Sequence, residues 1–246
     1  MEYIQPLSGD FTWEAVGLPF GSVSWLVPDS GGFDTFTRLF HPISGGPGDR
    51  LRWRDLAFSR GLEWHPEIQF ASLASASDPH QARFADLGRE RIERVLRHAI
   101  KVAGEDVTCV AALCDIDGWA SPVSGSSRED GTLGVSHDAL DRAGRLIGPA
   151  PVRRGYRRFE IRASDVSRFG VDGSGVMFVQ TQPTLVIASN GSFCLATDPD
   201  YDSTILAGGQ ALQDRVLRDQ SVESIAIDRT ASLLYDADRI NAHRAR

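Results

Sequence analysis

Hydrophobic positions recur at helical spacing in one long segment of the chain, residues 85–103. Charged residues fill the positions between them, and Glu90–Arg94 and Glu93–Arg97 lie four residues apart on the opposite face, where ion pairs stabilise a helix. We therefore predict an amphipathic helix that packs against the rest of the fold through one apolar face. Its apolar positions are Leu87, Ile92, Val95, Leu96, Ala99 and Ile100.

Shorter segments have the composition and alternation typical of β-strands. Residues 107–113 (VTCVAAL) are continuously β-branched or small and apolar, as in a buried strand. For residues 33–40 a helix is the alternative, but Pro42 holds the residue before it extended, which favours a strand. The same reasoning predicts strands over residues 22–27, 156–161, 204–206 and 224–227, and a second helix over residues 211–218.

Asn190 and Gly191 predict the tightest connection in the chain. They separate two apolar runs, residues 184–189 and 192–197, and Asn-Gly favours the positive φ angles of a type I′ turn. Such a turn sets the register of a β-hairpin. The expected facing pairs are Ile187 with Cys194 and Leu185 with Ala196.

Hairpin pairing, together with helices that are separate from the strands, predicts an α+β fold with a mostly antiparallel sheet and a few helices. The 246 residues suit a single domain, residues 1–246. A long polar stretch over residues 120–155 is the alternative boundary. It would join two lobes, residues 1–119 and 156–246, and the sequence leaves both organisations open.

The charge balance and hydropathy favour a protein of the cytoplasm. The 26 Lys and Arg residues against 33 Asp and Glu give a net charge of −7, which disfavours nucleic acid as a partner. No apolar run approaches the roughly 18 residues of a membrane span. The first residues have neither the basic start nor the apolar stretch of a signal peptide. A protein partner remains open, and a membrane partner is not expected.

The only lysine, Lys101, helps to exclude several enzyme classes. A P-loop requires Gly-Lys, whereas Lys101 follows Ile100. The motifs Gly-x-Ser-x-Gly, Gly-x-Gly-x-x-Gly and His-Glu-x-x-His are also missing. The three cysteines form no Cys-x-x-Cys pair, and we expect buried free thiols in a reducing compartment. These observations leave enzyme activity undecided and favour a protein without it.

Asp198, Asp200 and Asp202 form the densest polar motif, directly after the second hairpin strand. Alternating carboxylates can converge on a hard cation, so these residues are candidate ligands for Ca²⁺ or Mg²⁺. The alternative is an Asx-rich turn whose side chains accept hydrogen bonds from local amides. The letters Asp200-x-Asp202-x-Thr204 also match the nucleophile motif of haloacid-dehalogenase-type phosphatases. That class needs a lysine further along, and none follows here.

Two histidines each precede a proline, with basic and aromatic residues close to them in sequence. A cleft that held these side chains would bind an anionic or sugar-like ligand, with His41 or His65 as the acid–base candidate. The alternative is that both histidines are hydrogen-bonded structural residues beside an aromatic core. The candidate ligand-binding residues are Arg38, His41, Trp64 and His65.

Two patterns carry a resemblance. Phe36-x-Arg38-x-x-His41-Pro42 lies in the N-terminal half, and Asp200-Tyr-Asp202-Ser-Thr204 lies in the C-terminal half. Together with Trp25–Pro28, Arg52–Ala57 and Trp64–Glu67, they resemble a group of uncharacterised actinobacterial proteins. The chain departs from that group around Cys114–Trp119. The resemblance implies an actinobacterial origin, in agreement with the preference for arginine over lysine, and it implies no reaction because the group has none assigned.

Three functional hypotheses follow from these observations. The first is a non-catalytic binding or interaction protein that regulates or neutralises a partner and holds no cofactor. The second is a metal-assisted hydrolase or transferase that uses Asp198, Asp200 and Asp202 with His41 or His65, and it would require a divalent cation. The third is an anion or saccharide binder that uses Arg38, Trp64 and His65.

Overall fold

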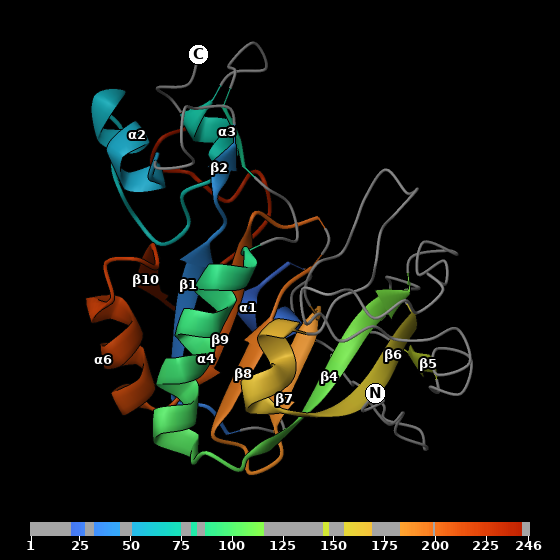
Figure 1. Ribbon diagram of the computed structural model, residues 1–246. Helices are drawn as coiled ribbons and strands as arrows, with labels where there is room; N and C mark the ends of the chain where they lie inside the picture. The colour runs from blue at the N-terminus through green and yellow to red at the C-terminus, as the bar shows by residue number, and fades with distance from the viewer. Residues whose placement is uncertain are drawn as a thin grey trace.

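The computed structural model describes residues 21–27, 32–44, 51–74, 80–82, 87–115, 145–147, 155–168, 183–198 and 200–242. Within these residues one eight-stranded sheet has the order β10-β1-β9-β8-β7-β4-β6-β5, and every neighbouring pair is antiparallel (Figure 1). This sheet and its helices confirm the predicted α+β class. The strands are β1 (Thr35–Phe40), β4 (Thr108–Asp115), β5 (Arg145–Ile147), β6 (Gly155–Arg162), β7 (Leu185–Ala188), β8 (Phe193–Ala196), β9 (Ser203–Gly208) and β10 (Ser224–Ile227).

Strand β1 comes early in the chain but lies between β9 and β10, two strands from the C-terminal part of the chain. Thr37 pairs with Leu206 of β9 on one side and with Ala226 of β10 on the other. Strands from both sides of the predicted polar connector therefore contribute to one sheet. Most of that connector lies outside the described residues.

The β7–β8 hairpin has the predicted register, with Ile187 opposite Cys194 and Leu185 opposite Ala196. Its turn differs from the predicted type I′ turn, because the amide of Gly191 donates to the carbonyl of Ala188 at 2.9 Å. Gly191 has a φ of 70°, which favours glycine. The Asn190 side chain accepts from Ser192 and donates to the carbonyl of Ala103, so it attaches the turn to the end of a helix.

One face of the sheet is covered by the helices α4 (Arg89–Ala103) and α6 (Gln210–Arg218) and the 3-10 helix η2 (Ala163–Arg168) (Figure 1). Helix α4 begins at Arg89, four residues later than predicted, because the φ of 86° at Gly88 interrupts the helical backbone. Inside the described ranges, no helix is long and apolar enough to cross a membrane. The core between the helices and the sheet includes Leu39, Val95, Leu96, Ala99, Phe159, Phe193, Leu206 and Val216.

The other face of the sheet carries a second apolar cluster, which helix α1 (Val23–Leu26) helps to cover. This segment was predicted as a strand, and that prediction is wrong. The Ser22 hydroxyl accepts a hydrogen bond from the Trp25 amide and so caps a short helix. A run of six residues is too short to distinguish helical from strand periodicity. Cluster members include Trp25, Phe36, Leu185, Cys194, Ile205 and Ile227.

A third apolar cluster lies beyond the end of β1. It packs helices α2 (Trp53–Ser59) and α3 (Phe70–Leu73) near a small sheet of β2 (Ile43–Ser44) and β3 (Gln81–Ala82). None of these short elements was predicted from the sequence. The cluster is centred on aromatic and aliphatic side chains, including Phe40, Ile43, Trp53, Leu56, Ile68 and Leu73.

Two of the three cysteines have described side chains, and both are buried free thiols, as predicted. They are Cys109 of β4 and Cys194 of β8. Burial raises the pKa of Cys109 to about 12 and that of Cys194 further still. Because the thiolate is the reactive form, both thiols are expected to be inert near neutral pH.

Leu96 tests the packing of α4 on the sheet. It is almost fully buried, so Leu96→Ala should lower the free energy of unfolding by about 2–4 kcal/mol through lost apolar burial and a cavity. The neighbouring exposed position is the control, and Arg97→Ala should change the free energy of unfolding by less than about 0.5 kcal/mol. Urea unfolding followed by circular dichroism measures both, and equal effects would contradict the assigned helix face.

Candidate functional site

Arg38 of β1 is the central residue of the candidate site, and its side chain is 0% exposed. Alternation along β1 places Arg38 and Phe40 on the face opposite Leu39, which packs under α4. The guanidinium contacts Asp202 and Ser203 at the start of β9, and it also contacts the loop that carries Pro66. It donates from Nε to Ser203 Oγ at 3.0 Å, from Nη2 to Asp202 Oδ1 at 3.0 Å, and from Nη1 to the carbonyls of Pro66 at 2.8 Å and Ile68 at 2.7 Å.

These bonds occupy four of the five N–H donors of the Arg38 guanidinium. Burial lowers the pKa of Arg38, and the paired Asp202 carboxylate opposes that shift. The guanidinium also lies 4.7 Å from the ring centroid of Phe40. Arg38 therefore joins β1, β9 and the 66–68 loop, and its charge is matched inside the protein.

His41, directly after β1 and Phe40, is also buried. Its Nε2 lies 2.9 Å from Thr204 Oγ1, its backbone amide donates to the Asp202 carbonyl, and its own carbonyl accepts from Trp53 Nε1. Ser203 and Thr204 are consecutive in β9, so their side chains point to opposite faces of the sheet. Because Arg38 binds Ser203 and His41 binds Thr204, these two candidate residues act on opposite faces.

Trp64 lies in the third apolar cluster, on the same side as Arg38. Its ring centroid is 4.8 Å from that of Phe40, and Phe40 in turn contacts Trp53 at 4.9 Å. Such tilted aromatic pairs stabilise a core beyond their buried area. The partly buried Trp64 thus packs at the edge of this cluster.

His65 forms a separate buried group with residues near the C-terminus. Its Nε2 lies 2.8 Å from Asp238 Oδ1, and Asn241 donates to Asp238 Oδ2 at 3.1 Å. Burial raises the pKa of Asp238, but hydrogen bonds from Asn241, Ser72 and His65 outweigh this effect and hold it below its usual value. Asn241 also exchanges hydrogen bonds with the backbone of Glu63. This group fastens the C-terminal segment to the loop that carries His65.

The three aspartates of the acidic motif have different environments. Asp198 Oδ1 accepts the Asp200 amide at 2.9 Å, which is the local geometry of an Asx turn. Asp200 is exposed, whereas Asp202 is paired with Arg38. Among the described residues, no group of three or more His, Cys, Asp or Glu side chains is placed to hold a metal ion.

Several residues that organise the site were not identified from the sequence. Glu223 accepts hydrogen bonds from the amides of Trp53 and Arg54, so its carboxylate caps the first turn of α2. Burial raises the pKa of Glu223, and these two amides oppose the shift. Asp238 and Asn241 lie in a segment without hydrophobic periodicity, so no sequence signal indicated that they meet His65.

Residues 116–119, at which the chain departs from the resembling group, lie outside the described residues. No protein-family model, no curated protein and no solved structure matches this chain. The resemblance to actinobacterial proteins therefore stays a prediction, and the site has to be interpreted from its own geometry.

Arg38→Met tests whether the buried pair maintains the fold. It removes the cation and leaves the Asp202 carboxylate buried without its partner, so we expect a loss of about 3–5 kcal/mol in unfolding free energy. The double variant Arg38→Met/Asp202→Asn should recover part of this loss because no unpaired charge remains. Urea unfolding measures both variants. A single variant within about 1 kcal/mol of the wild type would contradict this role.

The lowered pKa of Asp238 predicts how its contribution to stability varies with pH. A lowered pKa in the folded state means that the ionised form favours folding. This contribution is complete above the usual pKa of 3.8 and is lost as the pH falls through the folded-state value. Asp238→Asn should therefore be less stable than the wild type at pH 7, and the difference should shrink below about pH 4.

Denaturant unfolding between pH 7 and pH 3 measures this difference. The control is Asp236→Asn, because Asp236 is exposed and lies two residues away. Its difference from the wild type should be small at pH 7, as is usual for an exposed side chain. A pH-independent loss for Asp238→Asn would show that the carboxylate charge does not contribute.

Proposed function

We propose that this chain is a non-catalytic binding protein whose partner is another protein. The observation that carries the proposal is the use of the Arg38 guanidinium. It donates hydrogen bonds to Asp202, Ser203 and two backbone carbonyls, so Arg38 has a structural role within the fold. An anion or a sugar would have to replace these buried contacts, each of which is costly to leave unmade.

The same contacts weigh against the two alternative hypotheses. A metal-assisted reaction would need Asp202 as a ligand, but its carboxylate already neutralises Arg38. An anion or saccharide site would need Arg38 beside His65, but His65 is paired with Asp238. Both alternatives remain testable, because a ligand that binds the folded state must stabilise it.

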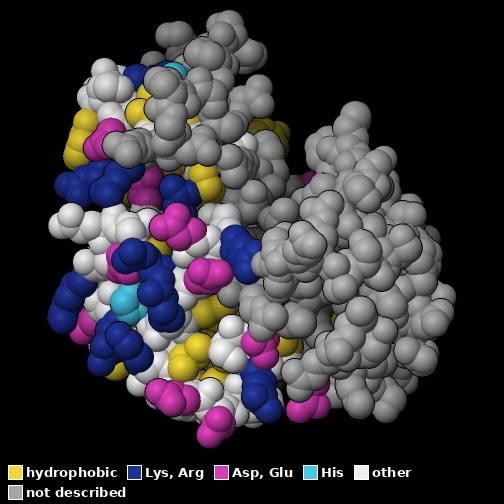
Figure 2. Space-filling model, in the orientation of Figure 1, with side chains coloured by type: hydrophobic (Ala, Val, Ile, Leu, Met, Phe, Trp, Pro, Cys, Tyr) yellow, Lys and Arg dark blue, Asp and Glu magenta, His cyan; other side chains and the backbone are white. Residues whose placement is uncertain are grey.

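The distribution of charge supports a binding role. Helix α4 carries five basic residues and two acidic ones in a chain whose net charge is −7. Figure 2 shows Lys and Arg side chains gathered around a histidine over α4 and α6. Binding surfaces are distinguished by such local differences in potential. The buried thiols Cys109 and Cys194 suit a partner in the reducing cytoplasm.

Thermal melting with divalent cations separates the binding proposal from the metal alternative. We expect Ca²⁺ and Mg²⁺ to have the same effect on the melting temperature of the wild type and of Asp200→Asn. Asp202→Asn should melt at a lower temperature with or without cations, because it breaks the pair with Arg38. A rise in melting temperature that both substitutions abolish would favour the metal-assisted hypothesis instead.

Phosphate and monosaccharides in the same assay test the third hypothesis. Since the donors of Arg38 are already engaged, neither class should raise the melting temperature. A rise that His65→Ala removes, but that the surface variant Arg239→Ala leaves in place, would support a ligand site at His65.

A further inference from the structure

The outer surface of α4 and α6 is the strongest candidate for the binding surface, and its assignment rests on the function proposed above. We call it the α4–α6 face. The two helices lie side by side (Figure 1) and are joined by Asp219, which directly follows α6. Asp219 lies 2.8 Å from His98 Nε2 and 3.5 Å from Arg94 Nη1. The face comprises Arg94, Arg97, His98 and Lys101 of α4 with Arg215 and Arg218 of α6.

Three acidic groups at this face, Asp219, Glu93 and Asp214, are already paired with basic side chains. Asp219 is largely buried under Arg94 and His98. Glu93 pairs with Arg89, whereas the sequence predicted a pair with Arg97. Glu90 of α4 is exposed and lies four residues before Arg94, on the same side of the helix. Arg218, whose side chain is 81% exposed, lies 3.8 Å from Asp214. Within the described residues, no ion pair involves the side chain of Arg97, Lys101 or Arg215. Their positive charge is therefore available to a partner.

Two aliphatic side chains are exposed on the same helices. Val102 of α4 is 40% exposed and Leu217 of α6 is 39% exposed. The large exposed aromatic side chains of the described residues, Phe58 and Tyr235, lie on other segments. Val102 is four residues after His98 and borders the α4–α6 face, whereas Leu217 is two residues from Arg215 and points to the other side of α6. The face thus combines cationic side chains with one exposed aliphatic side chain and no exposed aromatic ring.

From this combination, we propose that the α4–α6 face binds an acidic segment of a partner protein that also carries aliphatic side chains. Carboxylates of the segment would pair with Arg97, Lys101 and Arg215, and an aliphatic group of the segment would cover Val102. Interfaces recognise partners through such complementary potentials around apolar contacts.

Nucleic acid fits this face less well. A single strand is held by aromatic side chains that stack on its bases, and neither helix exposes one. A long phosphate backbone would also extend beyond the face onto a chain whose net charge is −7. A short acidic peptide avoids both difficulties. It needs no aromatic stacking, and it is short enough to contact only the basic side chains of the α4–α6 face.

Fluorescence anisotropy on the full chain tests the proposal. The probe is a labelled peptide of alternating Glu and Leu residues, compared with a single-stranded oligonucleotide of similar length. We expect the peptide to bind more tightly than the oligonucleotide, with an affinity that falls as salt rises. Arg97→Glu/Lys101→Glu should weaken peptide binding about tenfold or more.

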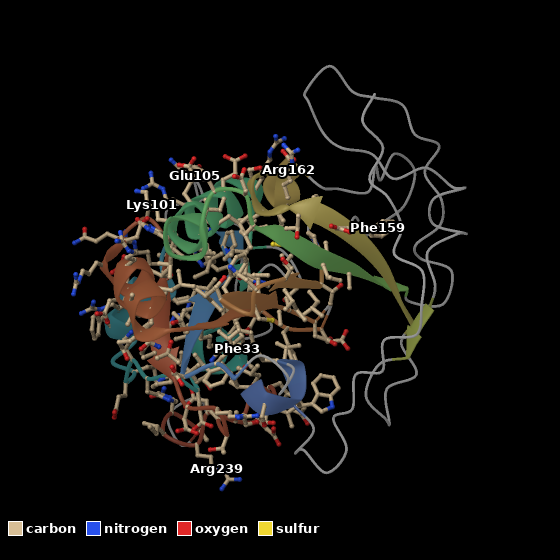
Figure 3. All side chains as sticks on the ribbon, turned by 90° about the horizontal axis from the view of Figure 1, so that it is seen from below. Phe33, Lys101, Glu105, Phe159, Arg162 and Arg239 are labelled. Carbon is tan, nitrogen blue, oxygen red and sulfur yellow. The ribbon has the colours of Figure 1, made fainter. Side chains whose placement is uncertain are left out.

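The matched control is a charge reversal on the opposite side of the molecule. Figure 3 shows Lys101 extending outward from α4 and Arg239 on the other side of the sheet. Lys101→Glu should weaken binding several-fold, whereas Arg239→Glu should leave it nearly unchanged. Melting temperatures of all variants establish that each is folded.

The single lysine provides a direct readout of position. Carbodiimide coupling joins a carboxylate to a nearby amine, and Lys101 is the only lysine side chain in the protein. Mass spectrometry should find the peptide attached to Lys101, and unlabelled peptide should compete with this product.

Three results would overturn the assignment: no peptide binding at low salt, equal binding by the double variant and the wild type, or tighter binding of the oligonucleotide through the same residues. None of these involves Asp198–Asp202, so the face can be wrong while the proposed non-catalytic role stands. That role fails independently if the cation assay reveals a metal site.

Discussion

The buried Arg38 guanidinium is the interaction on which the arrangement of this protein depends. A charge taken out of water is tolerated only when hydrogen bonds and an opposite charge replace its hydration. Arg38 meets that requirement by joining β9, through Asp202 and Ser203, to the 66–68 loop. The third apolar cluster is thereby held against the sheet, and the loop places His65 where the C-terminal segment can reach it.

The middle of the sheet is covered on both sides, and this limits the surfaces that remain for a partner. Alternate residues of β8 and β9 supply two different apolar clusters, so both faces of the sheet are covered at these two strands. Polar groups inside the fold, such as Asp238, Glu223 and His41, are engaged with backbone or side chains nearby. A binding function must then use outward-facing side chains, and α4 and α6 each carry more basic than acidic residues in a chain whose net charge is −7.

The sequence correctly predicted the helices and strands whose pattern of apolar residues or turn residues is contained within a short segment. Strand β10 and the register of β7 with β8 followed from alternation and a turn, and α4 followed from its apolar stripe. Helix α1 was missed because four residues have no measurable period. The partners of Arg38 and His65 were missed for another reason. Asp202 and Asp238 lie more than 160 residues away from them in sequence, and only the folded chain brings such residues together.

A net negative charge does not prevent this chain from attracting an acidic partner. Salt at physiological concentration screens exposed charges over about 8 Å, so a bound segment responds chiefly to the groups nearest to it. On the α4–α6 face most of those groups are arginine and lysine, because Asp219 is covered by Arg94 and His98, and Glu93 pairs with Arg89. Most of the remaining negative charge lies on other segments and acts mainly at long range, where it slows the approach of large polyanions. The same charge distribution therefore favours short acidic segments over extended nucleic acids.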